Sequence, residues 1–180
     1  MESLREKTLK TTEIYDGKVF KITRDDVELC DGYKSIREVV HHNGGVVIVA
    51  EKDNKILMVQ QYRYPTKETL YELPAGKLDK TGEDILSAAK RELEEETGYN
   101  AQSWGHLGFI WTSPGFCSEK LHLFKATNLS FKGQHLDEGE ILNYHAIEIE
   151  KVFEMIKTGE INDAKTICAL MRAYKLWLKW

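Results

Sequence analysis

Residues 74–100 read PAGKLDKTGEDILSAAKRELEEETGYN, a stretch that combines a helical apolar pattern with a dense acidic cluster. Its apolar residues recur at the spacing of one helical face, which predicts a helix packed on a core. Those residues are Leu86, Ala89 and Leu93. Thr81 stands three residues before Asp84 in a capping-box-like arrangement, and Gly98 supplies a stop at the end. The stretch therefore predicts a short amphipathic helix with defined boundaries.

The spacing of the acidic residues determines which of them lie on the same face of the helix. At about 100° per residue, Glu92, Glu95 and Glu96 converge on one patch, while Glu94 points elsewhere. Like charges at this spacing cost ~0.3 kcal/mol per pair, and Arg91, four residues before Glu95, can hold one carboxylate in place. Mg²⁺ takes one or two carboxylates together with substrate phosphates. The patch therefore predicts a divalent metal site, and a solvated acidic face remains the alternative.

Composition and charge narrow the functional classes. The chain has 180 residues, of which 42% are apolar and 30% charged, as is ordinary for one globular domain with a buried core. Its formal charge of −4 and its lack of a basic stripe argue against a nucleic-acid partner. An anionic substrate would then be bound through local arginines or through metal ions.

Membrane insertion and export are not expected. No run approaches the ~18 apolar residues of a membrane span, and the N-terminus lacks an apolar segment of signal-peptide type. The cysteines are odd in number and far apart, which fits neither a closed disulfide framework nor a zinc site of paired ligands. They are Cys30, Cys117 and Cys168. We therefore expect a cytoplasmic protein with no membrane partner.

On both sides of the acidic helix in the sequence, the pattern of apolar residues predicts strands. Residues 12–42 alternate as an antiparallel ribbon, with left-handed turn positions at Asp16-Gly17 and Asp31-Gly32. Uninterrupted Val, Ile and Leu on both sides of a turn at Asp53-Asn54 predict strands buried on both faces. The predicted strands after the ribbon are 44–50, 55–62, 106–111, 120–127 and 141–149.

The C-terminal part predicts two more helices. The first lies near 149–158 and ends at Gly159, and the second begins around Asp163, a candidate N-cap. Strands interleaved with three helices predict an α/β (α+β) fold, with a mixed sheet covered by helices and an N-terminal antiparallel β ribbon. We expect residues 1–42 to form this ribbon as part of the same fold unit, and 43–180 to form the main domain.

The acidic helix and the loop before it resemble the signature of the Nudix hydrolases, a glycine, a glutamate and then R-E-apolar-x-E-E-x-G-apolar. Six residues separate Gly76 from Glu83 where the signature has five, so we place a one-residue insertion at 80–82. The matching residues are Gly76, Glu83, Arg91, Glu92, Leu93, Glu95, Glu96, Gly98 and Tyr99. The resemblance implies a Nudix α/β/α sandwich over residues 43–180.

Other segments are similar to the ADP-ribose pyrophosphatase branch of that family. They are REVVHHNGGVVIV, QQYRYP, ELPAGKLD, SPGF, GEINDAKT and the N-terminal ribbon. This resemblance implies hydrolysis of ADP-ribose to AMP and ribose 5-phosphate with Mg²⁺ or Mn²⁺. It also implies a homodimer whose N-terminal strands reach the other subunit and take part in dimerisation.

The same resemblance assigns catalytic and metal-binding roles. The implied metal ligands are the carboxylates of Glu92, Glu95 and Glu96 and the carbonyl of Ala75. Supporting roles fall to Gly76, Glu83, Arg91 and Gly98. A glutamate on a loop after the signature is implied as general base or further ligand, and the candidates are Glu138 and Glu140. A solvated turn is the alternative for these two.

Candidate substrate contacts are less specific. Arg63, at the end of a buried strand, suits a phosphate clamp because guanidinium pairs with phosphate in a bidentate way, and the alternative is a surface salt bridge. The resemblance implies that Arg37 contacts substrate in the partner subunit. It also implies that Ser113 and Gly115 lie in a loop near the sugar, or else form a plain turn. Three aromatics could stack on adenine or belong to the core, namely Trp104, Phe109 and Trp111.

Two other functions stay open. The same chemistry could act on another nucleoside diphosphate derivative, such as GDP-mannose or another nucleotide sugar, a dinucleotide or an oxidised nucleotide. A non-catalytic module that senses ADP-ribose is the alternative from another class, and loss of the metal-binding glutamates would favour it. All three glutamates are present.

Overall fold

The computed structural model of the chain describes residues 4–80, 82–136, 139 and 141–175. These residues divide into two compact units, which are described separately. The first unit draws on residues 1–44 and 111–120, and the second on residues 45–110 and 121–180.

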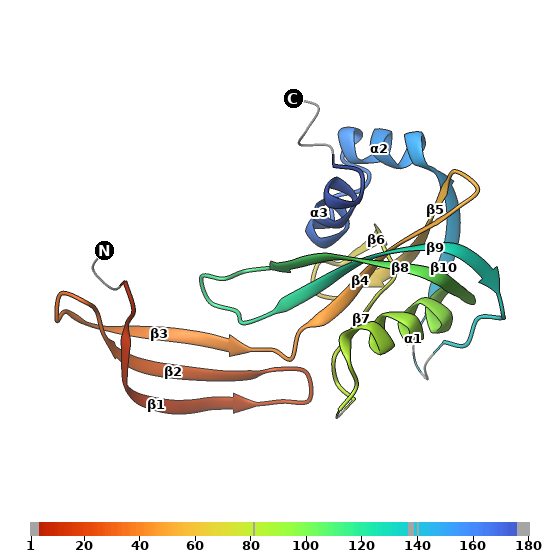
Figure 1. The fold of residues 1–180 in the computed structure, drawn as a ribbon. Helices are drawn as coiled ribbons and strands as arrows, with labels where there is room; N and C mark the ends of the chain where they lie inside the picture. The colour runs from red at the N-terminus through yellow and green to blue at the C-terminus, as the bar shows by residue number, and fades with distance from the viewer. Residues whose placement is uncertain (1–3, 81, 137–138, 140, 176–180) are drawn as a thin grey trace. The chain divides into compact units, whose positions relative to one another are not determined.

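The first unit is built on a three-stranded antiparallel sheet in the order β1-β2-β3 (Figure 1). Its strands are β1 (Lys7–Asp16), β2 (Lys21–Glu28) and β3 (Lys34–His41). The predicted ribbon is present and begins at Lys7, earlier than residue 12. Gly32 has the predicted left-handed conformation with φ of 86°. Gly17 does not have this conformation, and its N–H donates to the Phe20 carbonyl in the turn that joins β1 to β2.

The segment 111–120 belongs to this first unit. Val40 donates its N–H to the Phe116 carbonyl at 2.8 Å, and Ser118 donates to the Val40 carbonyl at 2.9 Å. These bonds make an isolated parallel bridge between β3 and Cys117. The segment that contains SPGF therefore extends the ribbon sheet by a short fourth stretch.

The second unit contains a seven-stranded mixed sheet. Its main path runs β10-β5-β4-β9-β8, with β6 paired to β5 and β7 paired to β4. The pair β4 and β9 is parallel, whereas β5 is antiparallel to β4, β6 and β10. The strands are β4 (Gly45–Lys52), β5 (Lys55–Arg63), β6 (Glu68–Glu72), β7 (Ala75–Lys77), β8 (Tyr99–Trp111), β9 (Lys120–Phe131) and β10 (Leu142–Glu148).

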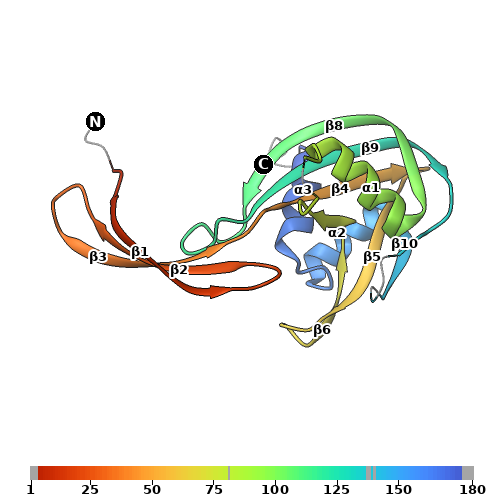
Figure 2. The ribbon, with the colours of Figure 1, turned by 90° about the horizontal axis from the view of Figure 1, so that it is seen from below.

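Helices cover both faces of this sheet (Figures 1 and 2). They are α1 (Ile85–Thr97), α2 (Ile149–Thr158) and α3 (Ala164–Ala173). Alternate residues of β4 point to opposite faces. Val46 and Ile48 join the core cluster that includes Leu93 of α1, while Val47 and Val49 join the cluster with α2 and α3. This arrangement confirms the predicted α/β/α sandwich and explains the uninterrupted apolar run of β4.

Several boundaries differ from the prediction. Strand β8 starts at Tyr99 rather than 106, and β6 and β7 were not predicted, because a half-exposed five-residue strand and a three-residue strand give no apolar alternation. Helix α1 begins at Ile85 with Asp84 as N-cap, whose carboxylate accepts from Leu86 N and Ser87 N. Thr81, predicted at the start, lies outside the described residues.

The helix ends follow the prediction more closely. Gly98 ends α1 with φ of 76° and donates its N–H to the Glu94 carbonyl. Gly159 ends α2, and Asp163 caps α3 by accepting from Thr166 N. Across the part of the chain that is described, none of the helices has the length and apolarity needed to span a membrane.

Candidate functional site

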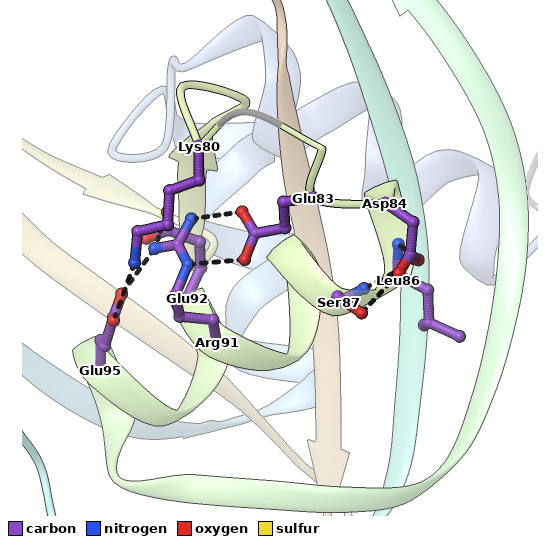
Figure 3. Close-up of polar contacts among 8 residues, drawn as sticks. All are labelled: Lys80, Glu83, Asp84, Leu86, Ser87, Arg91, Glu92 and Glu95. Carbon is purple, nitrogen blue, oxygen red and sulfur yellow. Dashed lines mark hydrogen bonds and ion pairs between the residues drawn. The ribbon is translucent and has the colours of Figure 1, made fainter.

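The acidic patch of α1 is organised around one arginine (Figure 3). Arg91 Nε and Nη2 bind the Glu83 carboxylate at 3.0 and 3.1 Å. Its Nη1 donates both to Glu92 Oε1 and to Glu95 Oε2, each at 2.7 Å. Lys80 Nζ lies 3.9 Å from Glu95. Two of the three predicted carboxylate ligands therefore converge on a single nitrogen.

These contacts fix the positions of Arg91 and of the carboxylates around it. The hydrogen bonds that Arg91 donates to Glu83, and then the carboxylates of Glu92 and Glu95, raise the pKa of Arg91 despite its partial burial. Arg91 in turn lowers the pKa of Glu83. The arginine is thus a permanent cation among carboxylates, and it orients them for any ligand that uses their outer oxygens.

Gly76 of β7 gives Glu92 its position. A Cβ atom on Gly76 would lie 1.8 Å from Glu92 Cδ and 2.0 Å from Oε1. The carboxylate therefore lies directly against the backbone of the strand, where only glycine leaves room. This contact explains physically why a glycine precedes the acidic helix.

Glu96 faces the same strand end from inside. Its side chain is buried, at 1% exposure, and Oε2 accepts from the Ala75 N–H at 3.1 Å. The Pro74 carbonyl accepts from Ile48 N at 2.9 Å, which fixes this bend to β4. The Pro74-Ala75-Gly76 bend and α1 therefore approach each other through two carboxylates, those of Glu92 and Glu96.

The segment after β9 closes the C-terminal end of α1. Gln134 Nε2 donates to the Glu96 carbonyl at 2.6 Å, and His135 N donates to the Glu95 carbonyl at 3.2 Å. Helix carbonyls in the last turn lack partners within the helix, so this segment supplies them. It leads to residues 137–140, and the two predicted base candidates, Glu138 and Glu140, lie outside the described residues.

The donor set suits a hard divalent cation, although the described residues do not by themselves form a complete cage. Within residues 4–80, 82–136, 139 and 141–175, no three His, Cys, Asp or Glu side chains lie close enough together to hold a metal ion. Glu92 and Glu95 nevertheless approach one shared point, and oxygen ligands are those that Mg²⁺ prefers. A cation bound by these two carboxylates competes with Arg91 for their oxygens.

Arg63 contacts a residue that the sequence did not single out. Its Nε and Nη2 bind the two oxygens of Glu72, each at 2.6 Å, which leaves Nη1 outside this pair. Glu72 is buried at 1% exposure and also contacts Lys165. The signal that could have identified Glu72 was a carboxylate directly before the apolar residues Leu73, Pro74 and Ala75, where burial requires a cationic partner.

The other predicted substrate residues belong to the first unit. Arg37 binds Glu6 Oε1 at 2.6 Å, as well as the Ser35 hydroxyl and the Ile36 carbonyl. The Ser113 carbonyl accepts from Phe116 N and Cys117 N, which makes residues 113–117 a tight turn that includes Gly115.

The three aromatic candidates divide by their exposure. Trp104 packs edge-on against Phe124 within a core cluster, with ring centroids 6.1 Å apart. Phe109 and Trp111 are exposed at 42% and 50%. Trp104 therefore contributes to the core, whereas the other two have faces open to solvent.

Two family models match the chain. The model of the NUDIX domain matches residues 40–170, and that of the nucleoside diphosphate sugar hydrolase N-terminal domain matches residues 6–40. The chain is 45% identical over 168 residues to methanol dehydrogenase activator from Bacillus methanolicus, covering 92% of this chain and 90% of the relative. It is 43% identical over 173 residues to ADP-ribose pyrophosphatase from Bacillus subtilis (strain 168), covering 94% and 93%. A crystal structure of an ADP compounds hydrolase matches with a TM-score of 0.87 and 25% identity, covering 99% of this chain and 97% of that one.

Proposed function

The chain belongs to the Nudix family, and we propose that it hydrolyses the pyrophosphate bond of ADP-ribose to AMP and ribose 5-phosphate. The observation that carries the proposal is the 43% identity, over 94% of the chain, to the ADP-ribose pyrophosphatase of Bacillus subtilis. A Nudix hydrolase of another nucleotide sugar is the second candidate, favoured by the N-terminal model matched at residues 6–40.

The proposed cofactor is Mg²⁺, with Mn²⁺ as the alternative. Its ligands would be the carboxylates of Glu92, Glu95 and Glu96 and the carbonyl of Ala75. A divalent cation in such a site neutralises the diphosphate and lowers the pKa of a water nucleophile. The contacts of Arg91 with Glu92 and Glu95 support this assignment, because they bring two of these carboxylates to one point.

The chain's own residues would orient the substrate. Arg63 binds the diphosphate through guanidinium N–H groups that Glu72 does not use. Arg37, from the partner subunit, and the Ser113-Gly115 turn contact the nucleoside and sugar parts. Either Glu138 or Glu140 removes the proton from water.

We also propose a homodimer in which the ribbon of residues 1–42 mediates dimerisation. Exposed apolar side chains on that unit support it, among them Ile14 at 60% and Tyr33 at 67% exposure. The proposed compartment is the cytoplasm, and the free thiols of Cys30, Cys117 and Cys168 are consistent with reducing conditions.

The test is an assay of AMP release from ADP-ribose with Mg²⁺, run beside a panel of nucleotide sugars, dinucleotides and oxidised nucleotides. Glu96→Gln keeps the size of the side chain and should remove most of the activity. Glu94→Gln, two residues away and on a different face of α1, is the matched control and should retain the activity. Binding of ADP-ribose without turnover would contradict the proposal in favour of a sensor, and an unaffected Glu96→Gln variant would contradict the mechanism.

A further inference from the structure

An ion network centred on the buried Glu72 joins three elements of the second unit. Glu72, the last residue of β6, binds Arg63 of β5 through both carboxylate oxygens at 2.6 Å. Lys165 of α3 contacts Glu72 Oε2, the oxygen that also accepts from Arg63 Nη2, and it lies 3.0 Å from Asp163 Oδ1. One carboxylate oxygen is therefore shared between two cations from different elements.

The contacts favour the charged forms of Glu72 and Arg63. Burial alone would raise the pKa of Glu72, but Arg63 and Lys165 together outweigh burial and hold it below its ordinary value. Glu72 likewise raises the pKa of Arg63, to which Glu96 adds a smaller effect. Arg63 therefore lies within electrostatic reach of a proposed metal ligand.

The backbone around Lys165 is fixed independently of its ammonium group. Thr166 Oγ1 is buried and accepts from Leu73 N at 2.9 Å, which docks the first turn of α3 on the strand end next to Glu72. Asp163 Oδ2 accepts from Thr166 N at 3.0 Å and caps the helix. Removing the charge of Lys165 should therefore leave α3 in place.

We propose that Lys165 is a positioning residue that sets the orientation of the Arg63 guanidinium through Glu72, and so the strength with which the chain holds a diphosphate. This inference rests on the proposed function of Arg63. With Lys165 present, Glu72 Oε2 is pulled by two cations and the carboxylate plane is fixed between them. Without it, the pair of Glu72 and Arg63 loses its anchor on α3, the carboxylate neutralises Arg63 alone, and the remaining N–H groups of Arg63 are no longer held in one direction.

If the network served only the stability of the fold, the expected result would differ. In that case, loss of Lys165 would lower stability and the amount of active protein, but active molecules would bind substrate normally. A positioning role raises KM and leaves kcat nearly unchanged, because the contact with the diphosphate is weakened in ground state and transition state alike.

The experiment compares Lys165→Met with Lys165→Arg, and with Lys157→Met, at an exposed position of α2, as matched control. For Lys165→Met we expect KM for ADP-ribose to rise on the order of tenfold, with kcat changed by less than about twofold. Lys165→Arg, which keeps the charge, should restore most of the difference, and Lys157→Met should match the wild type. If thermal unfolding shows that Lys165→Met does not fold, Lys165→Gln takes its place.

A double-mutant cycle tests whether the effect passes through Arg63. In an Arg63→Lys background, Lys165→Met should add little further increase in KM, because the guanidinium that it orients is gone. Equal fold-changes in both backgrounds, or a normal KM for Lys165→Met, would overturn the inference. Calorimetric Kd values for ADP-ribose across the same variants test the inference even if the wild type releases no AMP, an outcome that would overturn only the proposed function.

Discussion

Gly76 and Glu92 lie so close together that the identity of one residue sets the position of the other. Their contact combines backbone of a short strand with the end of a flexible side chain. The fold does not need this approach, because a displaced Glu92 could turn toward solvent. The site does need it, because Arg91 Nη1 then bridges Glu92 and Glu95.

For this reason, Gly76→Ala should reduce activity far more than stability. The new Cβ would displace the Glu92 carboxylate, since the two would otherwise overlap, and a misplacement of about 1 Å can lower kcat about 100-fold. Steady-state hydrolysis of ADP-ribose and the Mg²⁺ concentration for half-maximal rate measure the loss. The melting temperature should change by no more than a few degrees, roughly a 1 kcal/mol effect.

Gly105→Ala is the matched control for this substitution. A Cβ on Gly105, in strand β8, meets no heavy atom within 4 Å. This variant should retain wild-type rate and metal requirement. A Gly76→Ala enzyme as active as the Gly105→Ala enzyme would refute the argument that the approach of Glu92 matters.

At the scale of elements, local sequence patterns predicted most features of α1. The spacing of Glu92, Glu95 and Glu96 and the stop at Gly98 follow from helical geometry alone. The partners of the helix did not follow, because they are remote in sequence: Gln134 is 38 residues from Glu96. Lys165 is more remote still from Glu72, at 93 residues. A single sequence carries periodicity but not tertiary pairing, so both contacts required the structure.

Another remote network makes stability depend on pH. Glu51 of β4 binds Lys125 of β9 at 2.8 Å and accepts from Tyr174 Oη, at the end of α3, at 2.7 Å. Burial acts to raise the pKa of Glu51, but these partners together lower it below 4.5. A lowered folded-state pKa contributes stability that is fully present above the unfolded value and is lost as the pH falls through the folded value.

Glu51→Gln should therefore lower the free energy of unfolding by about 1 kcal/mol at pH 7. The difference from wild type should shrink as the pH falls below 4.5, because the wild-type carboxylate becomes protonated as well. Urea unfolding midpoints at several pH values measure it, with Glu160→Gln, at an exposed position after α2, as control. A difference that stays constant down to the acid limit would contradict the assignment.

At the scale of the whole molecule, the two units differ in how far their apolar side chains are buried. The second unit buries two clusters of apolar side chains between its sheet and helices. The three-stranded sheet of the first unit and its turns leave large ones exposed, among them Leu9, Ile14, Tyr15, Val19, Phe20, Tyr33 and Ile36. Its surface also carries a hollow lined in part by Leu9, Val27, Tyr33 and Ile36. A three-stranded sheet with this much exposed apolar surface is unusual for a monomer and fits burial against a second copy.

Ile14→Glu should therefore dissociate the proposed homodimer. Ile14 is 60% exposed, so the substitution costs the isolated chain little, but a dimer interface would have to bury the new charge. Analytical ultracentrifugation should show a wild-type dimer and a variant whose dissociation constant is higher by at least about tenfold, or ~1.4 kcal/mol. Ile141→Glu, at an 87% exposed site of the second unit, introduces the same charge and should remain dimeric. A monomeric wild type, or dissociation by Ile141→Glu but not by Ile14→Glu, would overturn dimerisation through the ribbon, and with it the role of Arg37 in the partner's site.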